Sequence, residues 1–190
     1  MALSLDINGL VFDTTCLSHF AIADRIDVLG HYVSGVPCYS TTVVLDEIRR
    51  GAVKYPQLEA VAGQEWISFQ RMDSSVERLT SFVRWTTMFG SQNDRDLGEA
   101  SVMAVAAELN VTALVDDQAA KRVALQHHGE VHGTLWLLAE VWRVGGATEV
   151  QLCNLVNALA DSGMRLPCNG TEFPDFVKEN KLGRWAKPKR

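Results

Sequence analysis

The chain has 190 residues, 47% of them hydrophobic and 22% charged, and a formal net charge of −5 at pH 7. This composition excludes an intrinsically disordered chain and indicates one globular domain with a sizeable core. No apolar run approaches the length of a membrane span, and the N-terminus lacks the layout of a secretory signal. We therefore expect a cytoplasmic protein that does not contact a membrane.

The charge is distributed unevenly along the chain. Residues 178–190 contain six basic residues and one acidic residue, so this tail carries +5 and leaves −10 for the rest. A basic arm on an acidic body suggests contact with phosphate or with an acidic surface. A solvated, frayed terminus has the same composition, and the sequence leaves both interpretations open.

The first half of the chain alternates short apolar runs with helical patterns. In order, the predicted elements are a strand at 10–12, a helix at 14–25, a strand at 36–40, a helix at 42–50, a strand at 66–69 and a helix at 74–88. Thr41 or Thr42 suits the N-cap of the second helix, and Gly51 suits its end. The apolar positions of the last helix, which we expect to face the core, are Val76, Leu79, Phe82, Val83 and Trp85.

The second half continues the alternation. Its predicted elements are a helix at 96–109, a strand at 111–115, a helix at 118–126, a short strand near 131, and helices at 134–144 and 148–159. Strands separated by helices imply βαβ crossovers and parallel strand pairing. We therefore predict an α/β fold, a three-layer α/β/α sandwich around a central, mainly parallel sheet.

Four acidic residues lie at the boundaries of these elements. Asp13 and Asp116 directly follow apolar strand patterns, Glu99 lies in the first turn of a helix, and Glu47 lies on the second helix. Because ligands bind beyond the carboxyl ends of parallel strands, we expect these carboxylates to converge there. Without a cation they would repel one another.

The residue types in this group favour a hard metal ion. Carboxylate oxygens without a Cys or His cluster select Mg²⁺ or Mn²⁺ rather than zinc. The Thr14 hydroxyl, next to Asp13, suits a supporting role that orients a carboxylate. Asp117 is either a further ligand or a helix cap, and the sequence does not separate it from Asp116.

Each acid also has an ordinary structural interpretation. Asp13, Asp116 and Asp117 are all suitable helix N-caps. Asp96 and Glu99 have the spacing of a capping box, in which the acid satisfies the helix terminus. Only the combination of acids in the expected order favours a site.

That ordered set of segments resembles the signature of PIN domains. The resembling segments are 11–14, 44–51, 96–101 and 114–117, and 133–135 is similar to the segment that closes those domains. The resemblance covers about residues 9 to 165. It implies a nuclease domain over residues 1–166 and leaves 167–190 as a C-terminal extension with a basic tail.

The resemblance implies a metal-dependent endoribonuclease that uses Mg²⁺ or Mn²⁺, and many small members of the family are VapC-type toxins of bacterial toxin–antitoxin pairs. By it, Asp13, Glu47, Glu99 and Asp116 are the catalytic acids and Thr14 supports them. Many such toxins have Asp where this chain has Glu99, and the chain is longer than the smaller toxins.

The expected partners are RNA, an antitoxin protein and a second copy of the chain. Because the acidic site repels RNA, affinity must come from basic residues near it. The candidates are Arg49, Arg50, Lys54, Lys121 and Arg122, with Trp185 in the basic tail as a base-stacking residue. We expect Trp136 and Trp142 to be core or dimer contacts rather than a platform for a base.

Two other functions compete with the nuclease. A metal-dependent phosphatase of the haloacid-dehalogenase type also begins with an Asp after the first strand, but it requires a second Asp where this chain has Thr15. A non-catalytic module that binds a protein through its C-terminal helices is the other. Four acids in one crevice are not needed in a scaffold, which favours the nuclease.

Overall fold

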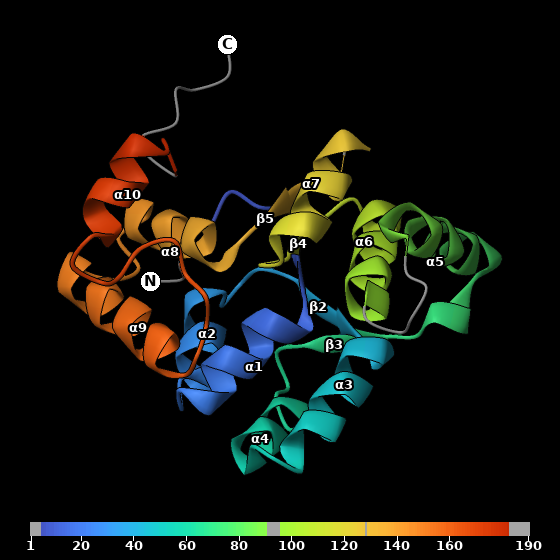
Figure 1. Ribbon diagram of the computed structural model, residues 1–190, viewed down its shortest axis with the longest axis horizontal. Helices are drawn as coiled ribbons and strands as arrows, with labels where there is room; N and C mark the ends of the chain where they lie inside the picture. The colour runs from blue at the N-terminus through green and yellow to red at the C-terminus, as the bar shows by residue number, and fades with distance from the viewer. Residues whose placement is uncertain (1–4, 91–95, 128, 183–190) are drawn as a thin grey trace.

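The computed structural model, which describes residues 5–90, 96–127 and 129–182, has a five-stranded sheet in which every neighbouring pair is parallel (Figure 1). The strands lie in the order β3-β2-β1-β4-β5. Their bounds are Leu10–Phe12 (β1), Cys38–Thr41 (β2), Ser68–Gln70 (β3), Thr112–Leu114 (β4) and Val131–His132 (β5). The predicted α/β fold with a parallel sheet is confirmed.

Helices cover both faces of this sheet. Their bounds are Thr14–Ile22 (α1), Ile26–Tyr32 (α2), Thr42–Ala52 (α3), Glu59–Ala62 (α4), Val76–Phe89 (α5), Leu97–Leu109 (α6), Gln118–Gln126 (α7), Thr134–Arg143 (α8), Glu149–Asp161 (α9) and Phe173–Glu179 (α10). Helix α1 packs against α2, α3 and α4, whereas α5 packs against α6 and α7. Figure 1 shows α8 to α10 on the side of α1 and α2, and α5 and α6 on the other side.

The strand order contains a reversal that creates a crevice. From β1 the chain moves outward through β2 and β3, and then returns to add β4 and β5 on the opposite side of β1. Right-handed crossovers in opposite directions place their helices on opposite faces of the sheet. The crevice therefore opens at the carboxyl ends of β1 and β4, the usual ligand position in open α/β sheets.

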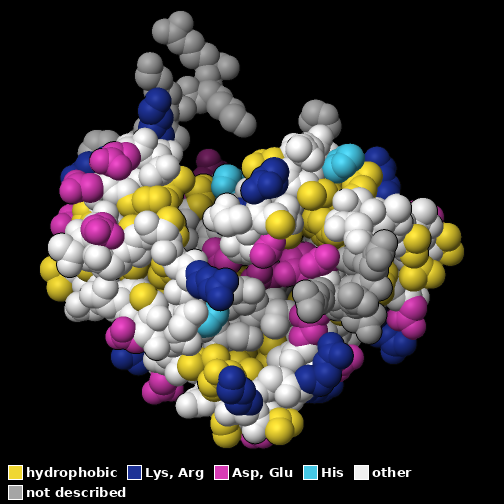
Figure 2. Space-filling model, viewed as in Figure 1, with side chains coloured by type: hydrophobic (Ala, Val, Ile, Leu, Met, Phe, Trp, Pro, Cys, Tyr) yellow, Lys and Arg dark blue, Asp and Glu magenta, His cyan; other side chains and the backbone are white. Residues whose placement is uncertain are grey.

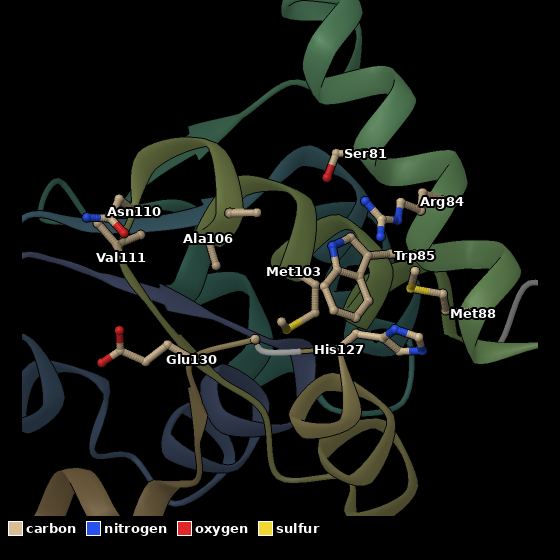
Figure 3. Close-up of a pocket in the computed structure, with 12 residues that line it drawn as sticks. Ser81, Arg84, Trp85, Met88, Met103, Ala106, Asn110, Val111, His127 and Glu130 are labelled. Carbon is tan, nitrogen blue, oxygen red and sulfur yellow. The ribbon is translucent and has the colours of Figure 1, made fainter.

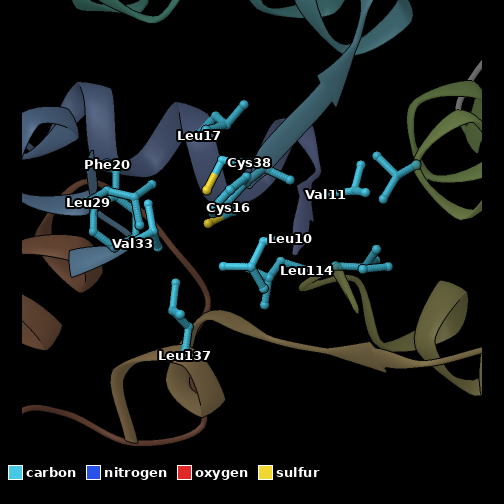
Figure 4. Close-up of a cluster of buried hydrophobic side chains, with 14 of the residues drawn as sticks. Leu10, Val11, Cys16, Leu17, Phe20, Leu29, Val33, Cys38, Leu114 and Leu137 are labelled. Carbon is cyan, nitrogen blue, oxygen red and sulfur yellow. The ribbon is translucent and has the colours of Figure 1, made fainter. Parts of the chain in front are cut away.

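A continuous apolar core fixes the strands that end at this crevice. Leu10 and Leu114, on the neighbouring central strands, are fully buried, as are Leu17 and Phe20 on α1 and Leu137 on α8 (Figure 4). Each fully buried side chain of this size contributes about 1.5–3 kcal/mol to stability. The ends of β1 and β4 are thus set by close packing from helices on the α1 side of the sheet.

Several predicted helix boundaries differ from the structure. The helix predicted at 14–25 ends at Ile22, because Asp24 adopts a left-handed backbone with φ of 55° and a separate helix, α2, begins at Ile26. Helix α3 continues past Gly51 to Ala52. Helices α2, α4 and α10 were not predicted, since they have only 7, 4 and 7 residues and are too short to show a helical apolar period.

The predicted inward face of the helix that is α5 is confirmed only in part: Trp85 is buried and Phe82 packs against the core, but Val76, Leu79 and Val83 are exposed. Val76 is 76% exposed and Val83 57% exposed, whereas Trp85 and the charged Arg78 are buried. Burial of Arg78 is possible because its guanidinium pairs with Glu108 on α6 at 2.5 Å and also donates to the Arg71 carbonyl oxygen at 3.0 Å. A satisfied ion pair therefore determines which face of the helix is turned inward.

The segment after residue 166 continues the packed body. Helix α10 contacts α9, and its Phe173 and Val177 belong to the main core. The basic tail beyond Leu182, including Trp185, lies outside the described residues. Within the part of the chain that the structure describes, no helix combines the length and the hydropathy needed to cross a bilayer.

Candidate active site

Asp13 lies directly after β1 and is 1% exposed. As the N-cap of α1, it accepts a hydrogen bond on Oδ1 from the Cys16 backbone N–H at 2.8 Å. Its Oδ2 accepts a second bond, from the Asp116 backbone N–H at 3.2 Å. The cap predicted as an ordinary interpretation is therefore present, and the same carboxylate also joins the ends of β1 and β4.

Asp116 is held by the beginning of α8. The Thr134 backbone N–H donates to its Oδ1 at 2.9 Å, and the Thr134 hydroxyl donates to its Oδ2 at 2.6 Å. The N-cap residue Gly133 allows this approach, because a Cβ there would lie 2.7 Å from Asp116 Oδ1. The Lys121 Nζ lies 3.9 Å from the same oxygen.

Asp117 has a different environment from Asp116. Its Oδ1 accepts a bond from the Ala120 backbone N–H at 2.8 Å, so it is the N-cap of α7, and it is exposed. Asp116 thus bonds to Asp13 through its backbone, whereas Asp117 is an exposed helix cap; which of the two binds a metal ion stays a prediction.

Glu47 is placed among three helices. The Thr14 hydroxyl, at the start of α1, donates a hydrogen bond to Glu47 Oε2. Gly98, at the start of α6, leaves room for the same carboxylate, since a Cβ there would lie 2.6 Å from Glu47 Oε2. The beginnings of α3 and α6 are joined by buried hydroxyls: Thr41 Oγ1 and Ser101 Oγ are 2.7 Å apart, and Ser101 also donates to the Gly98 carbonyl oxygen.

The acids affect one another electrostatically. Burial, and then the charge of Asp116, raise the pKa of Asp13 well above its usual value. Burial, together with the charges of Glu47, Asp96 and Asp117, raises the pKa of Glu99 to about 7. Figure 2 shows acidic side chains gathered at the centre of one face of the molecule. Such repulsion is the situation that a bound cation relieves.

The donor set fits a hard divalent cation in its chemistry. All the groups are carboxylate or hydroxyl oxygens, the ligands that Mg²⁺ and Mn²⁺ prefer. The acids interact in overlapping pairs, Asp13 with Asp116 and Glu99, and Glu99 with Glu47 and Asp117. Among residues 5–90, 96–127 and 129–182, however, no three Asp, Glu, His or Cys side chains converge into a ready ligand group.

A cavity of about 440 Å³ lies over three of the acids, Glu99, Asp116 and Asp117. Two other residues that line it, His19 and Arg165, were not predicted. The His19 Nδ1 lies 2.9 Å from the Ser162 hydroxyl, and burial lowers the pKa of His19. These two residues come from α1 and from the segment after α9, and only the folded chain brings them together.

The predicted RNA-binding residues differ in how close they lie to the acids. Lys121 is next to Asp116, whereas Arg49 forms an exposed pair with Asp46 at 3.4 Å near the end of α3. Arg50 and Arg122 are exposed. Of this set, Lys121 is the residue that the structure joins to the acids by an ion pair.

A different cavity, of about 390 Å³, opens between α5, α6 and α7 (Figure 3). Trp85 and His127 meet edge to face within it, with ring centroids 6.2 Å apart. Asn110 and Glu130, which also line it, precede β4 and β5. This cavity is therefore at the amino-terminal edge of the sheet, opposite the acids.

Comparison with known proteins gives one match. A family model described as a PIN domain matches residues 9–171, a range that includes all four predicted catalytic acids and ends before α10. Neither the curated proteins nor the solved structures gave a match.

Proposed function

This chain belongs to the PIN-domain family, and from that premise we propose that it hydrolyses phosphodiester bonds in RNA with the help of a divalent metal ion. PIN domains are generally nucleases whose activity uses divalent metal ions. The observation that carries the proposal is the hydrogen bond that joins Asp13 and Asp116 at the switch point of the sheet, with Glu99 close enough to act electrostatically on Asp13.

The residues that would hold the ion are Asp13, Glu99 and Asp116, with Glu47 positioned by Thr14. When bound, Mg²⁺ or Mn²⁺ supplies charge neutralisation at the phosphate and Lewis acidity toward the attacking water. We infer that Asp13 is a ligand of fixed orientation, since backbone N–H groups restrain both of its oxygens. The Lys121 ammonium, close to Asp116, suits contact with a phosphate oxygen.

The Thr134 hydroxyl and backbone N–H orient the Asp116 carboxylate. Orientation of this kind matters because groups that hold a ligand in place commonly affect metal affinity and activity by about 10–100-fold.

Incubation of the purified chain with a labelled single-stranded RNA tests the proposal. We expect cleavage in Mg²⁺ or Mn²⁺ and none after chelation by EDTA, and Asp13→Asn should abolish it. Asp175→Asn is the matched control, because Asp175 is exposed on α10 and pairs with Lys178 at the surface. Equal cleavage by the Asp13→Asn and Asp175→Asn variants would contradict the proposal.

The same preparation separates the competing functions. Turnover of a generic phosphomonoester without cleavage of RNA favours the phosphatase. Absence of Mn²⁺ binding in a calorimetric titration favours the non-catalytic module.

We further propose that the protein is the toxin of a bacterial toxin–antitoxin pair, that it forms homodimers and that it acts in the cytoplasm. The buried free thiols of Cys16, Cys38 and Cys168 suit a reducing compartment. Growth arrest on expression of the chain, relieved by the Asp13→Asn substitution, is the expected result for a toxin.

A further inference from the structure

A second cavity, of about 240 Å³, adjoins the acidic one. The two cavities share Asp116, Gln118 and Arg165 in their walls. The second is formed by the turn from β5 into α8 on one side and by residues 165–182 on the other. A ligand bound there would therefore lie directly beside Asp116.

One wall of this cavity is aromatic. His132, at the end of β5, and Trp136, on the first turn of α8, are stacked with ring centroids 4.0 Å apart and planes inclined by only 10°. Both side chains are partly exposed. The other tryptophan of this helix, Trp142, packs instead against Phe173 at 6.2 Å and does not line the cavity.

The rest of the lining combines positive charge with apolar side chains. Lys121 and Arg165 contribute the charge, and Leu135, Leu166 and Phe176 contribute apolar surface. A stacked aromatic pair, apolar side chains, and cations beside Asp116 match the parts of a nucleotide, with its planar base and its phosphate. The volume suits one base and not a base pair.

We propose that this cavity, which we call the base pocket, binds the nucleobase of a single-stranded RNA nucleotide that adjoins the phosphate at the acidic site. In it the base packs against the stacked pair formed by Trp136 and His132, and Lys121 and Arg165 contact the phosphate. This inference rests on the proposed ribonuclease function and deepens it: the pocket makes single-stranded RNA the preferred substrate, because a base in a duplex is not available to enter it.

Binding of mononucleotides to the full chain without added metal tests the base pocket separately from cleavage. Uridine and adenosine 5′-monophosphates are compared with ribose 5-phosphate, which lacks the base, by calorimetry or by ligand-observed NMR. We expect at least one of the two nucleotides to bind about tenfold more tightly than ribose 5-phosphate, the effect of about one stacking contact.

Variants then locate the binding. Trp136→Leu should remove the preference for the nucleotide and leave the weak binding of ribose 5-phosphate unchanged, whereas Trp136→Phe should retain part of it. Trp142→Leu is the matched control on the same helix and should keep the full preference. Arg165→Gln, at an exposed position, should weaken nucleotide and ribose 5-phosphate alike.

The outcomes that overturn the base pocket are clear. Equal binding of both nucleotides and ribose 5-phosphate by the unaltered chain overturns it without any variant, as does a preference that survives in a folded Trp136→Leu protein. RNA cleavage without a base preference leaves the ribonuclease proposal intact and removes only the pocket. A base preference without RNA cleavage supports the pocket as a nucleotide site and removes the ribonuclease.

Discussion

The backbone N–H of Asp116 donates a hydrogen bond to the Asp13 carboxylate at 3.2 Å, across 103 residues of sequence. Because each residue follows one of the two central strands, this bond fixes the distance between the strand ends at the crevice. It also places a buried carboxylate next to a second acid, which is costly without a compensating cation. The packing of the two central strands therefore determines where the two acids lie, and substitution of an acid at this site should change metal binding.

Asp13→Asn should abolish stabilisation of the protein by Mn²⁺ while changing the stability of the metal-free protein little. An asparagine can still cap α1 through its Oδ1, but its Nδ2 cannot accept the Asp116 N–H bond. Because the substitution also removes the charge repulsion between Asp13 and Asp116, which opposes that loss, we expect the free energy of unfolding without metal to change by about 1 kcal/mol or less. Thermal unfolding with and without Mn²⁺ measures both effects. In the exposed Asp175→Asn control, the upward shift of Tm with Mn²⁺ should be kept; its loss there would show that the shift does not arise at the acidic site.

The metal-free protein should become less stable as the pH rises from about 4.5 to about 7. The pKa of Glu99 is raised to about 7 in the folded protein, chiefly by burial, so the folded state binds a proton that the unfolded state has already lost. Stability falls with pH wherever the folded state holds more protons, and the loss here is on the order of 1–3 kcal/mol. Asp13, whose pKa is also raised, adds to the same slope.

Urea unfolding in EDTA at several pH values measures this slope. The Glu99→Gln variant should flatten it, because a glutamine does not titrate, and a saturating divalent cation should reverse it in the unaltered protein. A slope that is the same in Glu99→Gln and in the unaltered chain would assign the pH dependence to other groups.

The positions of Asp13 and Asp116 at the sheet edge could be predicted from the sequence, because they follow directly from the strand pattern. An acid that directly follows a buried strand pattern must lie at the carboxyl edge of a parallel sheet, and the alternation of elements makes that edge common to Asp13 and Asp116. The structure confirms that β1 and β4 are neighbours. The position of Glu99 near that edge could be predicted for the same reason, since Glu99 lies in the first turn of α6, which begins there.

The groups that position these acids could not be predicted in the same way. Gly98 and Thr134 lie inside segments that the resemblance covers, but the need for a missing Cβ or for a hydroxyl appears only when Glu47 and Asp116 are placed beside them. Likewise, burial of Arg78 depends on Glu108, thirty residues away, and overrides the local apolar pattern of α5. Long-range polar contacts of this kind leave no periodic signal.

Gly98→Ala should reduce RNA cleavage by at least about tenfold. In a helix, alanine in place of glycine normally stabilises the protein by up to about 1 kcal/mol. Here its Cβ would lie 2.6 Å from Glu47 Oε2, so the carboxylate must move away from the Thr14 hydroxyl. Gly63→Ala is a matched control, because its Cβ would meet nothing closer than 3.8 Å. Full activity in Gly98→Ala would show that the position of Glu47 does not matter for cleavage.

Thr134→Val should lower Mn²⁺ affinity and RNA cleavage by about 10–100-fold, the usual effect of losing a group that orients a metal ligand. Valine keeps the shape of threonine and the backbone N–H bond to Asp116 Oδ1, but it removes the hydroxyl that donates to Oδ2 at 2.6 Å. Thr134→Ser keeps the hydroxyl and lacks only the methyl group of threonine, so it should retain most of the activity. Since Thr134 is fully buried, the free energy of unfolding must be measured alongside. If Thr134→Ser loses as much Mn²⁺ affinity as Thr134→Val at equal stability, packing at the start of α8, and not the hydrogen bond to Asp116, positions the acid.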